Sequence, residues 1–441
     1  MKNTSNRAAL VALLFYLSII PGVFAQVLPD SELKRCASAE REQLKVRLNP
    51  DWQQKRNKME RLIEDYIREH QNLRITADEV IRIPVVVHVI HDQNENSVGG
   101  LNNPNISDEQ IRTQIEVLNE DYNRLPNTLG HNTNPVGASA MIQFYLADYD
   151  PNGRLTTGIT RNRYTTKTSF NPFSDDLLLA NIAYWPSDKY LNIWTCRLSN
   201  SYLGLAQFPA TNKVEGLDTA NEANELTDGV IIDYRFFGRK TGAITSRIYN
   251  LGRTTTHEVG HWLGLIHTWG DTDCGTDYCE DTPRIEGPNR TTVCQEKFSN
   301  CGGVRTRNMI ENYLDYSPDS CMNIFTKDQV GRMRAVLAVS PRRASMVEFG
   351  KEGRLDPANN LTVEIFPNPA EAEMNVTVRF LDFQNFTYTI LDLNGRAIAT
   401  ENFRNVFSRR LPLNVSLLPP GMYFLRVETE LETVTKRFLV R

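Results

Sequence analysis

Residues 256–267 read Thr-His-Glu-Val-Gly-His-Trp-Leu-Gly-Leu-Ile-His and contain the pattern H-E-x-x-H-x-x-G-x-x-H. On a helix, His257 and His261 lie one turn apart on the same face, so two imidazoles can reach one cation. Gly264 lets the chain leave the helix sharply, which brings His267 back as a third ligand. Three neutral nitrogens with a fourth position left open are typical of a catalytic zinc site.

Glu258 is the expected general base of this site. It follows the first ligand directly, so its carboxylate can take a proton from a zinc-activated water and later donate it to a leaving amine. Hydrolysis of a peptide bond is the reaction that such groups are best suited to catalyse. The alternative is an amphipathic core helix with hydrogen-bonded histidines, but it would place three of the seven histidines within eleven residues.

The N-terminus has the three parts of a secretory signal peptide. Lys2 and Arg7 precede an apolar segment at 8–23. Small residues at the end of this segment place the cleavage site after Ala25, which gives a signal peptide at 1–25. The apolar run is shorter than the ~20 residues of a spanning helix, and no other stretch could cross a bilayer. We therefore expect a protein without a transmembrane segment that leaves the cytoplasm.

The whole chain has 441 residues, which is too many for a single core. A 40% hydrophobic content and a 23% charged content are those of a globular protein, and the net charge of -4 gives no reason to expect a nucleic-acid partner. Residues 26–79 are charged and look helical, as a propeptide would. At 80–350, segments with strand and helix patterns alternate, which predicts an α/β or α+β catalytic domain.

The C-terminal part has a different pattern. Residues 351–360 are polar and contain Gly and Pro, so we expect a linker. Short alternating strands separated by turn residues then follow at 361–441, which predicts a small antiparallel β-sandwich.

Seven cysteines lie in what should be an oxidising compartment, and five of them fall between Cys274 and Cys321. Structural disulfides are the expected role of this group. A zinc finger is the alternative, but the paired C-x-x-C knuckles that it needs are missing. Spacing alone does not choose among the possible pairings.

The central region resembles the metzincin clan of metalloproteases, and more closely the pappalysin family. The resemblance covers roughly residues 81–343 and includes the zinc motif, the strand at 83–89 and the segment Asn-Tyr-Leu-Asp-Tyr at 312–316. It implies a twisted mixed sheet with an active-site helix, one catalytic zinc ion and secretion as an endopeptidase. Leu314 lies where metzincins carry the methionine of the Met-turn, and its similar volume leads us to expect a working site.

Further residue roles follow from the same resemblance. Tyr316 would donate a hydrogen bond to the oxyanion, although a packed core tyrosine is an equal alternative. Some relatives cut before Arg or Lys, and Asp319 is a candidate for the acidic floor of such an S1′ pocket. Two disulfides near the site are implied, Cys279–Cys301 and Cys294–Cys321. Cys196 and Cys274 would then pair or stay free.

Calcium binding is also implied, because the family binds this ion near the site. The acidic loop offers four carboxylates as ligands, those of Asp271, Asp273, Asp277 and Asp281. A merely solvated acidic loop is the alternative.

Cys36 lies in the charged segment upstream of the catalytic domain. Thiolate is a good fourth ligand for zinc. The resemblance implies a cysteine switch, in which this sulfur displaces the catalytic water until the propeptide is cleaved. The alternative is an unpaired or intermolecular cysteine.

The C-terminal module resembles the sorting domain of the type IX secretion pathway. The matching stretches are Phe-Pro-Asn-Pro-Ala at 366–370, Leu-Asp-Leu-Asn-Gly-Arg at 391–396 and the ending at 436–441. It implies export through the periplasm by the type IX machinery, followed by release or attachment at the outer-membrane surface. An adhesive or substrate-binding sandwich is the alternative.

These observations predict a secreted zinc endopeptidase, made as a latent precursor and acting on proteins or peptides as a monomer. A second hypothesis is a catalytically weak surface protein that binds a partner and has kept its zinc site. Glu258 argues against this second hypothesis, because a degenerate site usually loses its base first.

Overall fold

The computed structural model describes residues 32–70, 80–209, 223–352, 361–430 and 432–441. The expected signal peptide at 1–25 and most of the expected linker at 351–360 lie outside these residues. Among the described helices, none is long and apolar enough to cross a membrane.

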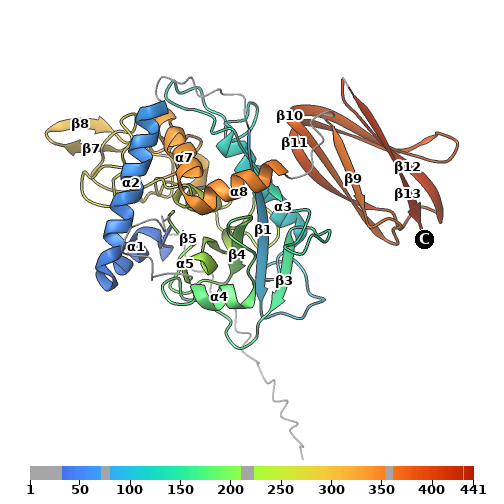
Figure 1. Cartoon of the computed structure of the whole chain (residues 1–441), viewed down its shortest axis with the longest axis horizontal. Coiled ribbons are helices and arrows are strands. Elements are labelled where there is room, and N and C mark those ends of the chain that lie inside the picture. Colours follow the sequence, from blue (N-terminus) through green and yellow to red (C-terminus); the bar gives the residue numbers. More distant parts are fainter. Residues whose placement is uncertain (1–31, 71–79, 210–222, 353–360, 431) are drawn as a thin grey trace, which may run out of the picture.

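Two helices open the described chain, α1 (Ser38–Leu48) and α2 (Pro50–His70). The amphipathic α2 buries Met59 and Ile63 against Val336 of helix α7 (Lys327–Val339). The two N-terminal helices lie on the opposite side of the molecule from the C-terminal domain (Figure 1).

A six-stranded sheet forms the centre of the molecule. Its strands are β1 (Ile81–His91), β2 (Ile142–Leu146), β3 (Ile159–Arg163), β4 (Leu191–Cys196), β5 (Gly204–Ala206) and β6 (Gly229–Asp233). The order is β2-β1-β4-β6-β5, and β3 pairs with the second half of β1. All pairings are parallel except that of the edge strand β5 with β6. The β-branched residues of β1 are buried on both faces, as expected for a central parallel strand.

Helices cover this sheet and complete the core. They are α3 (Asp108–Tyr122), α4 (Asp176–Ile182), the short α5 (Ala223–Leu226), α6 (Arg253–Trp262), α7 and α8 (Pro341–Glu352). The Ser107 hydroxyl accepts a hydrogen bond from the Gln110 amide and so caps α3. The main core lies between the sheet and helices α3, α6 and α7. The expected mixed α/β fold class is thereby confirmed.

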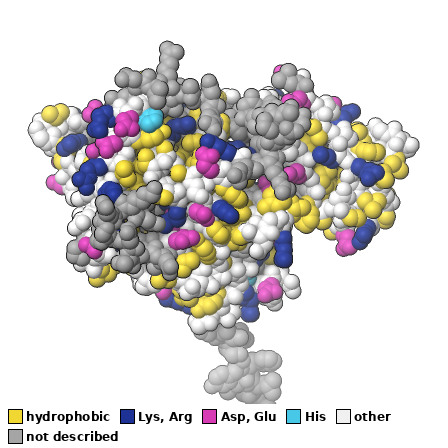
Figure 2. Space-filling model, viewed as in Figure 1, with side chains coloured by type: hydrophobic (Ala, Val, Ile, Leu, Met, Phe, Trp, Pro, Cys, Tyr) yellow, Lys and Arg dark blue, Asp and Glu magenta, His cyan; other side chains and the backbone are white. Residues whose placement is uncertain are grey.

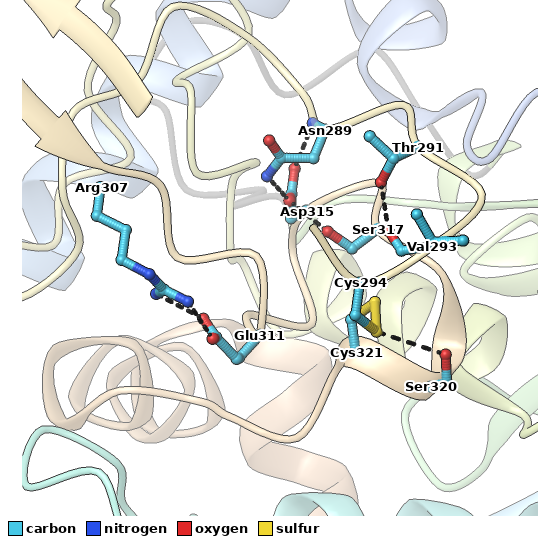
Figure 3. Close-up of a disulfide and its surroundings, with 10 residues drawn as sticks. All are labelled: Asn289, Thr291, Val293, Cys294, Arg307, Glu311, Asp315, Ser317, Ser320 and Cys321. Carbon is cyan, nitrogen blue, oxygen red and sulfur yellow. Dashed lines mark hydrogen bonds and ion pairs between the residues drawn. A yellow bond between two sulfur atoms is a disulfide. The ribbon is translucent and has the colours of Figure 1, made fainter. Parts of the chain in front are cut away.

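The segment between α6 and α7 contains the small hairpin of β7 (Phe298–Cys301) and β8 (Val304–Arg307) and a short 3-10 helix at Asp319–Cys321, and two disulfides fix it. Cys294 is bonded to Cys321, with Cα atoms 5.4 Å apart (Figure 3). The implied pair Cys279–Cys301 is wrong, because Cys301 is bonded to Cys274 instead.

The correction has a physical cause in the turn that precedes the hairpin. Cys274 adopts a left-handed φ of 54° in this turn, and its Cα lies 5.6 Å from that of Cys301. The Cys279 thiol is buried instead, and Cys196 is also a buried free thiol, in β4.

The C-terminal domain is an antiparallel β structure with its own apolar core. Its strands are β9 (Thr362–Phe366), β10 (Glu373–Leu391), β11 (Ala397–Asn414), β12 (Gly421–Glu428) and β13 (Thr433–Val440). The long β10 pairs with β9 at residues 375–379 and with β12 at 387–391, and register shifts separate these parts. One strand thus contributes to both layers of the expected small sandwich.

Figure 2 shows acidic and basic side chains interspersed across both domains on the face viewed, without a large patch of one sign.

Candidate active site

Helix α6 presents the predicted zinc ligands, and a glycine bounds it on each side. Gly252 caps its N-terminus with a φ of +80°. Gly264 lies just past its end with a φ of +86°, where a side chain would be strained. A methyl group at Gly264 would also lie 2.6 Å from Val336 of α7. The tight exit from the helix brings His267 back toward His257 and His261, as the motif predicted.

The three histidines converge on one point. Their Nε2 atoms lie 3.1–3.2 Å from one another, and all three side chains are fully buried. Four ligands placed tetrahedrally about 2.0–2.1 Å from a zinc ion would be about 3.3 Å apart. The observed spacing therefore fits a single small cation.

The outer nitrogens of these rings show why a cation is needed. Each ring donates its Nδ1 hydrogen to an oxygen: His257 to Tyr313 O at 2.7 Å, His261 to Leu265 O at 2.9 Å, and His267 to the Asp271 carboxylate. A neutral ring that donates from Nδ1 carries a lone pair on Nε2. Three lone pairs facing one another in a dry site repel unless a positive ion lies between them. The donor set thus fits the implied metal.

His267 is held differently from the other two ligands. Trp269 stacks on its ring, with centroids 4.2 Å apart and planes 10° apart. Asp271, one of the aspartates assigned to calcium by the resemblance, contacts the outer nitrogen of His267. Burial alone would raise the pKa of Asp271, but the contact with His267 holds this pKa below its usual value.

The four aspartates of the acidic loop do not come together. Asp277 accepts hydrogen bonds from Thr282, Asp281 accepts one from the Asp328 amide, and Asp273 is exposed. In the described part of the chain, the metal-competent cluster of histidine, cysteine and acidic side chains is Cys36 with the three histidines. The calcium assignment therefore stays a prediction.

Glu258 lies beside the histidines and is fully buried. Its Oε2 accepts a hydrogen bond of 2.8 Å from the Ser38 hydroxyl and lies 3.5 Å from the Cys36 sulfur. Burial raises the pKa of Glu258 to about 8, although the bonds from Ser38 and Cys36 act to lower it. A carboxyl with its pKa near neutrality is suited to exchange protons with a substrate.

Cys36 closes the open side of the site. One ligand atom from each of Cys36 and the three histidines lies within 4.8 Å of the others. The flanking chain follows the edge strand β5, where the Ala37 amide donates to Gly204 O at 3.0 Å and the Ser38 hydroxyl accepts from the Ala206 amide at 2.8 Å. The expected propeptide therefore covers both the metal ligands and the neighbouring strand edge.

Arg35 fills a buried pocket next to the site. Its Nη1 lies 2.7 Å from Asp319 Oδ1, and both side chains are 1% exposed. Its Nη2 donates to the Met322 sulfur at 3.3 Å, and its guanidinium lies 4.7 Å from the centre of the Tyr249 ring. The second carboxylate oxygen of Asp319 accepts from the Leu251 amide at 2.9 Å. Asp319 thus forms the base of a pocket that holds an arginine.

The turn beneath the histidines contains the two other predicted residues. Leu314 is fully buried, and a methyl group on Gly260 of α6 would lie 3.1 Å from its Cδ2. Leu314 therefore packs directly under the ligand helix, at the Met-turn position. The Tyr316 ring lies 5.0 Å from that of His267 and 4.8 Å from that of Trp269. It closes one wall of the site.

Several contributors were not identified in the sequence. Arg35 and Ser38 lie within two residues of Cys36. Arg35 is a cationic residue beside the proposed switch, so its charge could have suggested a pair with the acidic Asp319. Asp121 lies behind α6, where its carboxylate accepts from Arg253 at 3.0 Å and from Thr256 at 2.7 Å. No local pattern signals this contact, because the partners are more than 130 residues apart.

Two family models match parts of the chain. Residues 179–338 match the peptidase family described as Pregnancy-associated plasma protein-A, and residues 364–441 match the secretion system C-terminal sorting domain. The first match contains the zinc motif, and the second covers the strands β10 to β13.

Curated relatives and solved structures agree with these matches. An extracellular metalloprotease of Verticillium alfalfae is 30% identical over 59% of this chain and 77% of its own length. Extracellular metalloprotease 1 of Coccidioides posadasii is 34% identical over 52% of this chain and 69% of its own length. A promirolysin mutant of Tannerella forsythia has a TM-score of 0.59 and 35% identity, covering 72% of this chain and 99% of that one. Mature mirolysin with a cleaved peptide has a TM-score of 0.52 and 39% identity, covering 62% and 98%.

Proposed function

Because this chain belongs to the pappalysin family of metalloproteases and ends in a type IX secretion sorting domain, we propose that it is a zinc endopeptidase secreted as a latent precursor. The family and the sorting domain place it outside the cell or on the cell surface. The observation that carries the proposal is the convergence of three Nε2 lone pairs beside Glu258.

The proposed reaction depends on Glu258, on the three histidines and on the backbone of β5. Glu258 takes the proton of the attacking water and returns it to the leaving amine. The chemistry that a zinc ion on His257, His261 and His267 supplies is polarisation of the scissile carbonyl and a lower pKa of that water. The backbone of β5, which now binds the propeptide at Gly204 and Ala206, would bind an extended substrate in its place.

A preference for cleavage next to Arg or Lys is part of the proposal. Arg35 contacts Asp319, Met322 and Tyr249 in a pocket that borders the site. A substrate arginine could make the same charge-assisted contacts once the propeptide leaves. The mirolysin relative was solved with a cleaved peptide, which is consistent with a cleft that accepts extended chains.

Latency is proposed to depend on Cys36. Its sulfur lies with the three histidine nitrogens, so it can serve as the fourth ligand and exclude the water. Full-length precursor with Cys36→Ala should cleave a fluorogenic peptide before any cut in the chain, whereas the parent should not. A variant that stays fully latent would reject the switch.

The central experiment compares casein cleavage by protein lacking residues 26–79 with its Glu258→Ala variant. We expect Glu258→Ala to lose at least about 10²–10⁴-fold in rate, because the general base is missing. Glu280→Ala is the matched control, since Glu280 is exposed and distant from the proposed reaction. Removal of the metal with a chelator should abolish activity, and added zinc should restore it. Equal activity in the Glu258→Ala protein would reject the mechanism.

A further inference from the structure

We infer that the catalytic domain carries a docking site for the sorting domain, and that Arg410 of β11 is the residue that holds the two domains together. Arg410 forms an ion pair with Asp148 at 2.8 Å. It also donates to Thr157 O and, at 3.3 Å, to Thr156 O. One guanidinium thus crosses the domain boundary and contacts three acceptors.

Burial distinguishes Arg410 from its neighbour. The Arg410 and Asp148 side chains are 9% and 8% exposed, so the charges are largely out of water. Arg409 also crosses the boundary and pairs with Glu116 at 2.9 Å, but both of these side chains are 36% exposed. Exposed pairs contribute little, whereas removing one partner of a buried pair leaves a charge without compensation. Arg410 should therefore dominate the docking.

The receiving loop between β2 and β3 is already shaped for this contact. The Thr156 amide donates to Asp148 O at 2.8 Å, and the Asp150 side chain accepts from the amides of Asn152 and Arg154. Gly158, with a φ of +70°, brings the loop against Ala147, where a methyl group would lie 2.6 Å from the Ala147 amide nitrogen. The carbonyls of Thr156 and Thr157 are held in place by this loop, so the site exists without its ligand.

The boundary between the two domains also contains open space. Two open clefts, of about 580 and 340 Å³, lie along the boundary and are lined from both domains. Arg410, Asp148 and Thr377 line both clefts, so the arginine lies between them. The sorting domain also lies on the far side from the propeptide helices (Figure 1). The docking therefore fixes the module without covering the active site.

The test uses full-length precursor carrying Glu258→Ala, which prevents self-cleavage, and small-angle X-ray scattering. Arg410→Glu should increase the radius of gyration and broaden the distance distribution, because the carboxylate faces Asp148 and two carbonyls. Arg409→Glu is the matched control and should leave the scattering curve nearly unchanged. Asp148→Asn approaches the same contact from the other domain and should also loosen it.

Thermal unfolding of each variant confirms that both domains remain folded. The inference is overturned if Arg410→Glu gives the scattering curve of the parent, or if the parent already shows two independently moving domains. An equal expansion with Arg409→Glu would also overturn the special role of Arg410.

Discussion

The catalytic domain and the sorting domain are both built around a sheet, but they bury very different side chains. The catalytic domain encloses ionisable groups, including His88, Asp121, Arg253 and the active-site residues. Among the described residues of the sorting domain, the buried polar side chains are Thr377 and Thr389, together with the Arg410 side chain at the domain boundary. A domain that only has to be recognised can use an apolar core. A catalytic domain must keep polar groups dry, and leaving such a group without a partner costs stability.

This contrast makes the sorting domain an internal reference within the same chain. Changes to the buried polar groups should alter the catalytic domain and leave the unfolding of the sorting domain unchanged.

The largest effect is expected from Arg35→Ala. The substitution leaves Asp319 buried without its cation, and breaking a buried ion pair costs about 3–5 kcal/mol. The propeptide should bind correspondingly more weakly, so that the uncut precursor hydrolyses a fluorogenic peptide at a measurable rate. Arg47→Ala, at an exposed position of α1, should stay latent. If the two variants are equally latent, the buried pair does not contribute to inhibition.

The next effect is a loss of folding stability at acidic pH. Burial lowers the pKa of His88 to about 4, from 6.5 in the unfolded chain. Between pH 6.5 and pH 4 the unfolded state binds a proton at this histidine and the folded state does not. The contribution of His88 to stability is therefore present above pH 6.5 and is lost as the pH falls to 4. The loss from this group is about 3 kcal/mol.

Urea unfolding at pH 7 and pH 4.5 measures this loss. The catalytic transition should weaken at the lower pH, and His88→Gln should reduce the difference. The exposed His131 provides the control His131→Gln. An unchanged pH dependence in His88→Gln would show that other groups are responsible.

A smaller effect is expected from Asp271→Asn, which keeps the shape but removes the charge next to His267. Losing such an outer partner of a metal ligand typically lowers metal affinity 10–100-fold, or by about 1.4–2.7 kcal/mol. Competition with a chromogenic chelator measures zinc affinity directly. The exposed Asp273→Asn should bind zinc like the parent. If Asp271 were a calcium ligand instead, calcium dependence would shift and zinc affinity would not.

The smallest effect is expected from Leu314→Met. The two side chains have similar volumes, so stability should change by less than about 1.5 kcal/mol and peptidase activity should be retained. Leu314→Ala leaves a cavity under α6 and should cost about 2–5 kcal/mol. Chemical unfolding of the catalytic domain compares the two. A large activity gain with methionine would show that the turn has a role beyond packing.

The success of the sequence-based predictions depended on the distance between the interacting residues. His257, Glu258, His261 and His267 form one local motif, so the helix and the turn at Gly264 place them. The alternation of strands and helices in the catalytic domain follows from hydrophobic periodicity. Arg35 and Asp319 are 284 residues apart, and no local sequence pattern in either segment predicts their contact.

The incorrect disulfide was implied by the family resemblance, and the cysteine spacing could not correct it. Cys274 and Cys279 are close in sequence and precede the same hairpin, so spacing does not distinguish them. The left-handed turn at Cys274 directs one of them toward Cys301. The resemblance assigned Asp271 to a calcium site, whereas the structure places its carboxylate against His267.

The way in which the N-terminal segment is attached has a consequence for activation. Besides the contacts of Arg35 and Cys36, helix α2 packs on α7, and Glu60 pairs with Arg332 at 2.6 Å. Cutting the chain between α2 and β1 would break none of these contacts. The cut segment would then stay tightly bound and act as a competitive inhibitor of its own enzyme. Full activity would appear only after the segment dissociates or is digested, so dilution should shorten the lag that follows the cut.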